Sequence, residues 1–430
     1  VFYDDNGWQA PYLLQEWGQT YTLRDTIEML KRDFANVLAK GAGLWWYDMW
    51  GGWFDDPEIY SLISAMSEEM EYDLSRPAES VSPVAWIQAD DLLAYMPYDF
   101  DGTYDVLLQT HSNQKESLAK IGVPYDMYYL SDLEGGLDKK YDVYIIEAFG
   151  IDKDTRLDIE LYLERDGVTI IWVGLPGIYG EDGAVDPASV SELVGMDISL
   201  TSSAVCSVTI GNDSHYATEG MQGFVYGNQA SVGRVSPIGY VTDPDAVALG
   251  TLGASGLTGL AVKEIPLVSG ESWTSVYSAV GNIPAEFIRN LLKHAGANIY
   301  TEEGDVVFAN GNYLAIDSPY GGARCISLGG RYDVYDVFSG KTVAEGVEFF
   351  ETELEAGRTY LWRLAPSAEV PDPDPAPDPD PDPQPGGDSS GGGEAPGKGC
   401  GSSIGAVSVF VLLMTGIILM KRKQKRDKNQ

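Results

Sequence analysis

The sequence contains few of the residues that commonly carry metal or nucleophilic chemistry. Its three cysteines, Cys206, Cys325 and Cys400, lie far apart, so they predict neither a metal cluster nor a disulfide framework. The three histidines are equally scattered, which argues against a zinc site and against a histidine-based triad. The glycine-rich motifs of nucleotide-binding loops are also missing. We therefore expect no metal and no cofactor.

Basic residues are scarce as well. The 430 residues include 28 lysines and arginines against 65 aspartates and glutamates, which gives a formal net charge of −37. Proteins that bind nucleic acid need a basic surface to neutralise phosphates, so we expect no nucleic acid partner. We interpret the acidity as a property of the solvated surface. A chain of this length is expected to form two or three domains.

The C-terminal residues have the composition of a surface anchor. Alternating proline and aspartate, followed by glycine and serine, predict a disordered, extended spacer over 367–403. The apolar run at 404–420 predicts a transmembrane helix, and the basic residues of 421–430 are expected in the cytoplasm. This order resembles the anchors of Gram-positive surface proteins, although no LPxTG motif precedes it. Cys400 is a candidate processing or lipidation site. The residues before the spacer are expected outside the cell.

The N-terminal part of the chain predicts a helix, a strand and a second helix. TLRD at 22–25 fits a capped helix start, and apolar residues repeat at helical spacing until Gly41. GLWWYD at 43–48 is short, apolar and bounded by glycine, as expected of a buried parallel strand. An Asp-Pro pair at 56–57 fits the start of the next helix. The loop between them lies at the carboxyl end of the strand, where α/β folds build their sites.

That loop is unusually rich in aromatic and acidic residues. Tryptophan rings offer flat apolar faces, and carboxylates accept hydrogen bonds from hydroxyl groups, which together suit a carbohydrate ligand. The candidate substrate-binding residues are Trp45, Trp46, Asp48, Trp50 and Trp53, with Asp55 and Asp56 as further hydroxyl acceptors. The alternative is that some of these tryptophans fill the interface between strands and helices, and that Asp48 caps a turn.

Strands and helices alternate in the middle of the chain. The segments 84–88, 124–130, 141–148 and 168–174 read as strands, separated by helical stretches at 104–121 and 154–165. This alternation predicts a parallel sheet of flavodoxin-like type over 82–302, which continues through a less regular segment to a helix opened by Pro284. From 303 to 366, short strands separated by turns predict a small all-β sandwich.

The stretch DTIEMLKRDFANVLAKGAGLWWYDMWGGWFDDPEI resembles the last helix–strand–helix part of the (β/α)8 barrel in β-galactosidase-like enzymes of glycoside hydrolase family 42. The resemblance covers roughly residues 1–365 and implies that 1–76 is the C-terminal part of such a barrel. It also implies that 82–302 is the family's trimerisation domain, hence a homotrimer, and that 303–366 is its C-terminal β domain. The trimerisation domain is related to glutamine amidotransferases, but GLPGIYG, after the fourth strand, offers no nucleophile.

The resemblance further implies a retaining mechanism with two carboxylates about 5–5.5 Å apart on different barrel strands. The acid/base would lie on an earlier strand, upstream of Val1, and the start at a residue other than methionine indicates a fragment or a processed product. The nucleophile would be a glutamate that closes the seventh strand, but the matching sequence, VFYDDNGW, holds Asp4 and Asp5. Glu16 is the nearest glutamate. These three are the candidate catalytic carboxylates, and loop or capping aspartates are the alternative.

Two functions stay open at this stage. In the first, the chain is the C-terminal part of a membrane-anchored glycoside hydrolase that cleaves β-linked galactosides or related oligosaccharides. In the second, it is a surface carbohydrate-binding or scaffold protein that kept the fold and lost the chemistry. The missing glutamate favours the second function, whereas the tryptophan-rich loop fits both.

Overall fold

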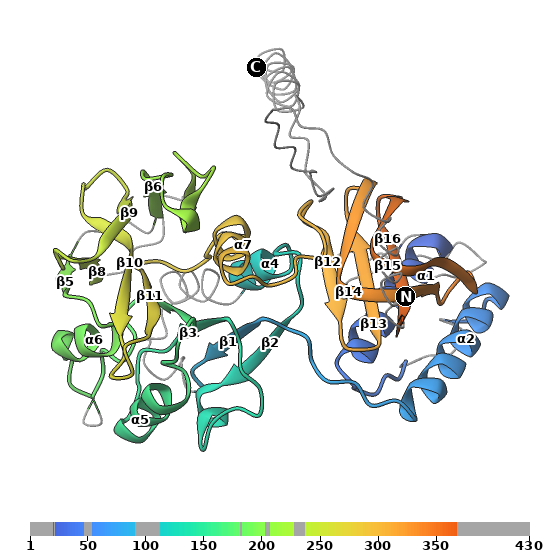
Figure 1. Ribbon diagram of the computed structural model, residues 1–430, viewed down its shortest axis with the longest axis horizontal. Helices are drawn as coiled ribbons and strands as arrows, with labels where there is room; N and C mark the ends of the chain where they lie inside the picture. The colour runs from blue at the N-terminus through green and yellow to red at the C-terminus, as the bar shows by residue number, and fades with distance from the viewer. Residues whose placement is uncertain are drawn as a thin grey trace, which may run out of the picture. The chain divides into compact units, whose positions relative to one another are not determined.

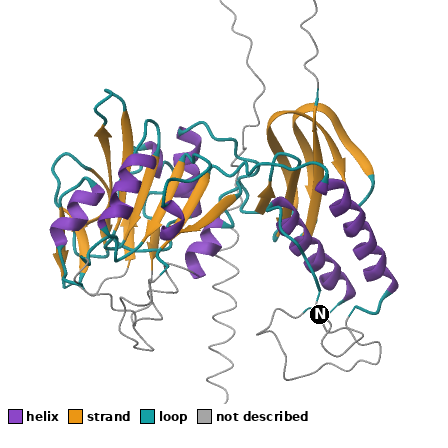
Figure 2. Ribbon diagram, turned by 90° about the horizontal axis from the view of Figure 1, so that it is seen from below, coloured by secondary structure: helices purple, strands orange, loops and turns teal. Residues whose placement is uncertain are grey.

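The computed structural model describes residues 20, 22–46, 54–90, 112–180, 183–202, 207–227 and 237–367. These residues form two β-sheets with helices packed against them (Figures 1 and 2). The predicted spacer, transmembrane helix and basic tail lie outside the described residues. Within the described ranges, no helix is both long enough and apolar enough to cross a membrane.

The two N-terminal helices form where the sequence predicts them, as α1 (Leu23–Ala39) and α2 (Pro57–Leu74). The side chains of Thr22 and Asp56 cap them, each accepting a hydrogen bond from a backbone N–H in the first turn. The strand predicted at 43–48 is absent from its described part, because 43–46 lie in no strand. A parallel strand needs a hydrogen-bonded neighbour, and none of the described strands pairs with these residues.

The larger sheet begins with five parallel strands, of which the sequence predicts the first four and not β11 (Ser272–Ser278). In spatial order they are β2 (Tyr125–Tyr129), β1 (Val84–Gln88), β3 (Val143–Glu147), β4 (Thr169–Val173) and β11 (Ser272–Ser278). Every residue of β1, β3 and β4 is buried. Because both faces of these strands are covered, their sequences are apolar without alternation.

Beyond β11 the sheet continues with antiparallel strands, which the sequence indicated only as a less regular segment. These are β10 (Thr258–Pro266), β9 (Val247–Leu252), β6 (Ser207–Ile210) and β7 (Val225–Gly227), with β5 (Ile198–Thr201) and β8 (Ile238–Val241) paired beside them. Glycine residues within these strands weaken the sequence pattern that is typical of a strand. At Gly250 a Cβ atom would approach the Thr209 carbonyl oxygen to 2.9 Å. The close packing of the neighbouring strand therefore requires glycine at this position.

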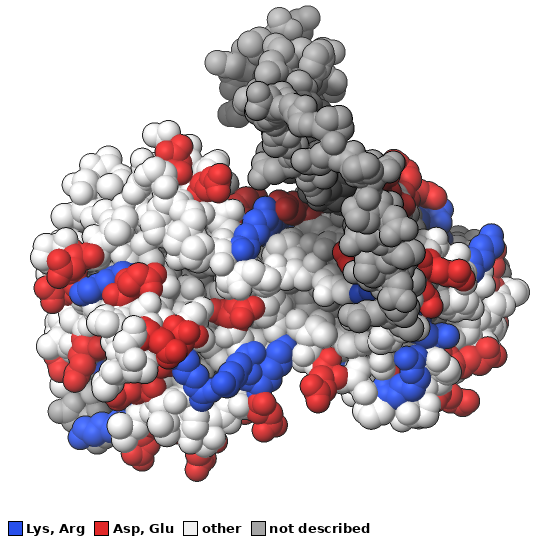
Figure 3. All heavy atoms as spheres, in the orientation of Figure 1, with Lys and Arg blue, Asp and Glu red and all other residues white. Residues whose placement is uncertain are grey.

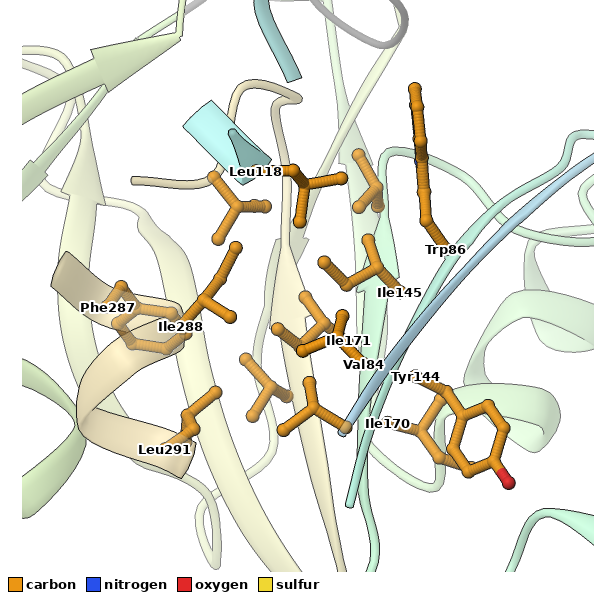
Figure 4. Packing of buried hydrophobic residues seen from close by; sticks show 14 of the residues in the cluster. Val84, Trp86, Leu118, Tyr144, Ile145, Ile170, Ile171, Phe287, Ile288 and Leu291 are labelled. Carbon is orange, nitrogen blue, oxygen red and sulfur yellow. The ribbon is translucent and has the colours of Figure 1, made fainter. Parts of the chain in front are cut away.

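Helices cover both faces of the parallel strands (Figure 1). On one face lie α4 (Gln114–Leu118) and α7 (Ala285–His294), and Figure 4 shows Ile145 and Ile171 of the sheet pointing toward α7. On the other face lie α5 (Lys153–Tyr162) and α6 (Pro187–Val194), with the short turns η3 (Leu130–Leu133) and η4 (Tyr216–Thr218) in the connections. The helix predicted at 154–165 is therefore confirmed as α5.

The second sheet contains five antiparallel strands in the order β12 (Val306–Ala309), β13 (Tyr313–Ser318), β16 (Arg358–Pro366), β14 (Gly322–Asp336) and β15 (Lys341–Leu354). We predicted a sandwich of two sheets, but the described strands form one sheet. Its Tyr313 and Leu361 pack with residues of α1 and α2 such as Phe34. The alternation of the strands signals a buried face, but it does not reveal whether a sheet or a helix covers that face.

A buried polar cluster fixes α2 to this sheet. The Glu69 carboxylate, on α2, accepts hydrogen bonds from the Tyr313 hydroxyl (2.6 Å) and from Nε of Arg363 (2.9 Å). The Arg363 guanidinium lies 4.1 Å from the ring centre of Tyr72, which adds a cation–π contact. Cys325, on β14, is disulfide-bonded, which the wide spacing of the cysteines did not predict because sequence distance does not fix spatial distance.

Candidate functional site

Only part of the predicted carbohydrate site lies in the described portion of the chain. The candidate catalytic residues Asp4, Asp5 and Glu16 fall outside it, as do the substrate-binding candidates Asp48, Trp50 and Trp53. Trp45 and Trp46 are described. The geometry of the predicted catalytic carboxylates therefore stays a prediction, and the described part of the site is the start of the aromatic loop, residues 41–46.

The aromatic loop leaves α1 with alternating inward and outward side chains. Leu44 and Trp46 pack against the cluster formed by α1, α2, β13 and β16. Trp45 lies between them in the sequence and is 74% exposed. Trp46 therefore anchors the loop, as the structural alternative predicted for some of the tryptophans, and Trp45 is the exposed residue of the pair.

The indole of Trp46 retains one unsatisfied group. Its Nε1–H is buried and has no hydrogen-bond partner among the described residues, although buried donors are nearly always paired. Asp56, predicted as an acceptor for sugar hydroxyls, instead accepts the backbone N–H of Glu58 at 2.8 Å as the cap of α2. Its carboxylate therefore has a structural role at the far end of the loop.

Glu147 is a second chemically notable residue, which the sequence patterns did not single out. It ends β3 at the carboxyl edge of the parallel sheet, and only 2% of it is exposed. One carboxyl oxygen accepts hydrogen bonds from Trp86 Nε1 (3.1 Å) and Gln88 Nε2 (3.2 Å). The other is buried, and no residue in the described part of the chain bonds to it. Burial raises the pKa of Glu147 to about 8, against the opposing effect of these two hydrogen bonds.

A neutral carboxylic acid at the carboxyl edge of a parallel sheet is a group that can hold a proton at physiological pH. The signal in the sequence was a single carboxylate closing the otherwise apolar strand VYIIE. Because the side chain is buried, we assign it to the stability of the sheet. Among the described residues, no three His, Cys, Asp or Glu side chains lie close enough together to hold a metal ion.

Acidic side chains do not gather in a single patch on the face seen in Figure 3. Acidic side chains are spread over that face, with lysine and arginine side chains between them. Such a distribution fits a solvated acidic exterior rather than one acidic binding patch.

Comparison with known proteins gives a match in fold but none in sequence. No protein-family model matches the chain, and no curated protein matches it. A β-galactosidase from Rahnella sp. R3 has a similar structure, with a TM-score of 0.55 and 15% identity over 81% of this chain and 53% of that one. A β-galactosidase from Bacillus circulans sp. alkalophilus has a TM-score of 0.49 and 16% identity, over 73% of this chain and 46% of that one. A GH42 β-galactosidase from G. stearothermophilus has a TM-score of 0.49 and 12% identity, over 78% of this chain and 50% of that one.

This chain spans about half the length of these β-galactosidases. At 15% identity, the likeness to the Rahnella enzyme shows the fold alone. The described residues therefore share a glycosidase-like fold with this β-galactosidase, and the family 42 resemblance seen in the sequence stays a prediction.

Proposed function

We propose that this chain is the C-terminal part of a cell-surface glycoside hydrolase, a retaining enzyme that cleaves β-linked galactosides or related oligosaccharides. The observation that carries the proposal is the likeness of the fold to a β-galactosidase, at a TM-score of 0.55 over 81% of the chain. The exposed side chain of Trp45, next to the partly buried Trp46, supplies a surface of the kind on which sugar rings stack.

In this proposal the residues of the aromatic loop line the sugar subsite. Trp45 supplies the platform, with Trp50 and Trp53 as further rings and Asp48 as an acceptor for sugar hydroxyls. Retaining hydrolysis needs a nucleophile and an acid/base that protonates the leaving oxygen. We assign the nucleophile to Asp4 or Asp5, with Glu16 as the alternative, and the acid/base to a barrel strand that precedes Val1. The reaction needs no cofactor.

The proposal extends to assembly and location. The resemblance of 82–302 to a trimerisation domain supports a homotrimer. The apolar run at 404–420 with its basic flank supports an anchor in the plasma membrane and an extracellular catalytic part. The disulfide at Cys325 suits an oxidising compartment outside the cytoplasm.

A second candidate function has its own support. The sequence that corresponds to the nucleophile strand contains two aspartates and no glutamate. A protein that kept the fold and the aromatic loop but lost the nucleophile would be a surface carbohydrate-binding or scaffold protein.

Hydrolysis of a panel of nitrophenyl glycosides by the full-length protein separates the two functions. For an enzyme, we expect turnover of the β-galactoside, with a loss of more than about a thousandfold in one of Asp4→Asn, Asp5→Asn or Glu16→Gln. Oligosaccharide binding should persist in that variant. Binding without hydrolysis of any glycoside in the wild type would favour the carbohydrate-binding protein.

Replacement of Trp45 by alanine tests the sugar platform. We expect the affinity for a galacto-oligosaccharide, measured by titration calorimetry, to fall about tenfold, which corresponds to about 1.4 kcal/mol. The melting temperature should stay unchanged because the ring is 74% exposed. Tyr320→Ala is the matched control, since it removes a ring from a residue that is 69% exposed, in the turn between β13 and β14. Equal affinities of the two variants would exclude Trp45 from the subsite.

A further inference from the structure

We infer that Lys40, Asp126 and Asn310 are positioning residues for the aromatic loop. Through these side chains, the two sheets fix the point at which the loop leaves α1 and the direction that it takes. This inference rests on the proposed function and identifies residues outside the loop that set its sugar-binding geometry.

The end of α1 first turns the chain by its own backbone. Ala42 N–H donates to the Val37 carbonyl (2.8 Å) and Gly41 N–H donates to the Leu38 carbonyl (3.2 Å). Gly41 has a φ of +63°, a conformation that glycine adopts without steric cost. These are the bonds of a Schellman motif, which satisfies two terminal carbonyls and directs the following residues away from the helix.

The second sheet holds the same helix end through Asn310. Its side-chain amide donates to the carbonyls of Leu38 (3.4 Å) and Ala39 (3.3 Å), and the residue is 5% exposed. Its amide oxygen accepts the backbone N–H groups of Asn312 and Tyr313, each at 2.9 Å. Asn310 is therefore fixed by the turn between β12 and β13 and joins that turn to the last carbonyls of α1.

The larger sheet holds the helix end through Lys40. The Lys40 ammonium lies 2.6 Å from a carboxylate oxygen of Asp126, on the edge strand β2, and also donates to the Tyr125 carbonyl. The other Asp126 oxygen accepts hydrogen bonds from Ser80 Oγ (2.6 Å) and the Tyr141 hydroxyl (2.9 Å). Burial raises the pKa of Asp126, but Lys40 and these hydrogen bonds outweigh it and hold the pKa below its ordinary value.

Trp45 lies five positions after Lys40, so the contacts of Lys40 affect the position of Trp45 through the backbone. Lys40 is the last residue before the turn, and Leu44 and Trp46 enter the apolar cluster directly after it. Loss of the contacts at Lys40 or Asn310 frees the last turn of α1 to fray, so the loop must be ordered again when sugar binds. That ordering lowers affinity without removing any group that touches the ligand.

The test compares Lys40→Met and Asn310→Asp with wild type in the full-length protein. Methionine keeps the apolar stem of Lys40, and aspartate keeps the acceptor of Asn310 while removing its donors. Lys120→Met is the control, because it breaks a 2.7 Å pair with Glu116 on α4. The readouts are hydrogen exchange of the amides in 40–46, galacto-oligosaccharide affinity, and kcat and KM where turnover is seen.

We expect exchange at Gly41 and Ala42 to quicken about tenfold and affinity to fall about three- to tenfold in both variants, with KM rising more than kcat falls. Lys120→Met should match wild type, and Asp126→Asn should add little to Lys40→Met. Unchanged exchange would overturn the inference, as would faster exchange with unchanged affinity in a protein that binds sugar. If wild type binds no sugar, the proposed function fails, and the exchange rates still decide whether these residues hold the loop.

Discussion

Replacing Asp305 with alanine should lower the free energy of unfolding of the second sheet by about 3–5 kcal/mol. Asp305 is fully buried, and its carboxylate pairs with the Arg324 guanidinium through contacts of 2.6 and 3.1 Å. It also accepts the Ser318 hydroxyl at 2.7 Å. The residue precedes β12, whereas its partners lie on β13 and β14, so one side chain ties three strands. Removing it leaves the buried Arg324 guanidinium with the more distant Glu303 carboxylate, 3.9 Å from Nε, as its remaining ion pair among the described residues.

Urea denaturation followed by tryptophan fluorescence would measure this loss, since Trp362 is buried in the same sheet. Arg24→Ala is the matched control. Its guanidinium pairs with Glu355 at 3.4 Å, but both side chains are more than half exposed, so the expected loss is below about 1 kcal/mol. A loss for Asp305→Ala no larger than that of the control would show that the buried pair does not hold the sheet together.

Replacing Glu147 with glutamine should change how stability depends on pH. The pKa of Glu147 is about 8 in the folded chain, against an ordinary value of 4.5. Between these values the unfolded chain has released the proton and the folded chain keeps it, so the free energy of unfolding falls as pH rises. The contribution of Glu147 is complete below pH 4.5 and is lost as pH rises through 8. Over this window the loss is at most about 5 kcal/mol.

Urea denaturation at pH 5, 7 and 9 would reveal the effect. Glutamine keeps an acceptor for Trp86 and Gln88 and does not ionise, so the stability of Glu147→Gln relative to wild type should rise with pH. The pKa of Glu164 is also raised, to about 7, by burial and by Glu160. Both proteins are therefore compared in a Glu164→Gln background. Parallel pH profiles for the two proteins would mean that Glu147 keeps an ordinary pKa.

The parts of the fold that could be predicted from the sequence depend on local signals. The caps at Thr22 and Asp56 need only a side-chain oxygen next to the first turn of a helix. The buried strands β1, β3 and β4 are short apolar runs, and the chain between them is long enough for crossovers. The antiparallel strands around Gly250 could not be predicted in the same way, because contacts with distant neighbours place them in the sheet.

The candidate site also has features that local sequence predicts and features that depend on distant contacts. The sequence showed that tryptophans and carboxylates gather after α1 and that a sugar ligand suits them. It did not show that Trp46 points inward and Trp45 outward, because the apolar cluster that decides this combines helices and strands about 300 residues apart. The preceding helix end is held by Asp126 and Asn310, and neither position carries a sequence signal that connects it to the loop.

By itself, the sequence determined the acidic exterior, the helix caps, the buried parallel strands and the concentration of aromatic residues in one loop. Composition and short-range periodicity are sufficient for these features. Only the tertiary structure decided that the second sheet is covered by α1 and α2, that Glu147 is buried with a raised pKa, and that two sheets hold the end of α1. These features depend on which surfaces meet when the chain folds, and burial and charge pairing between distant residues are fixed only at that stage.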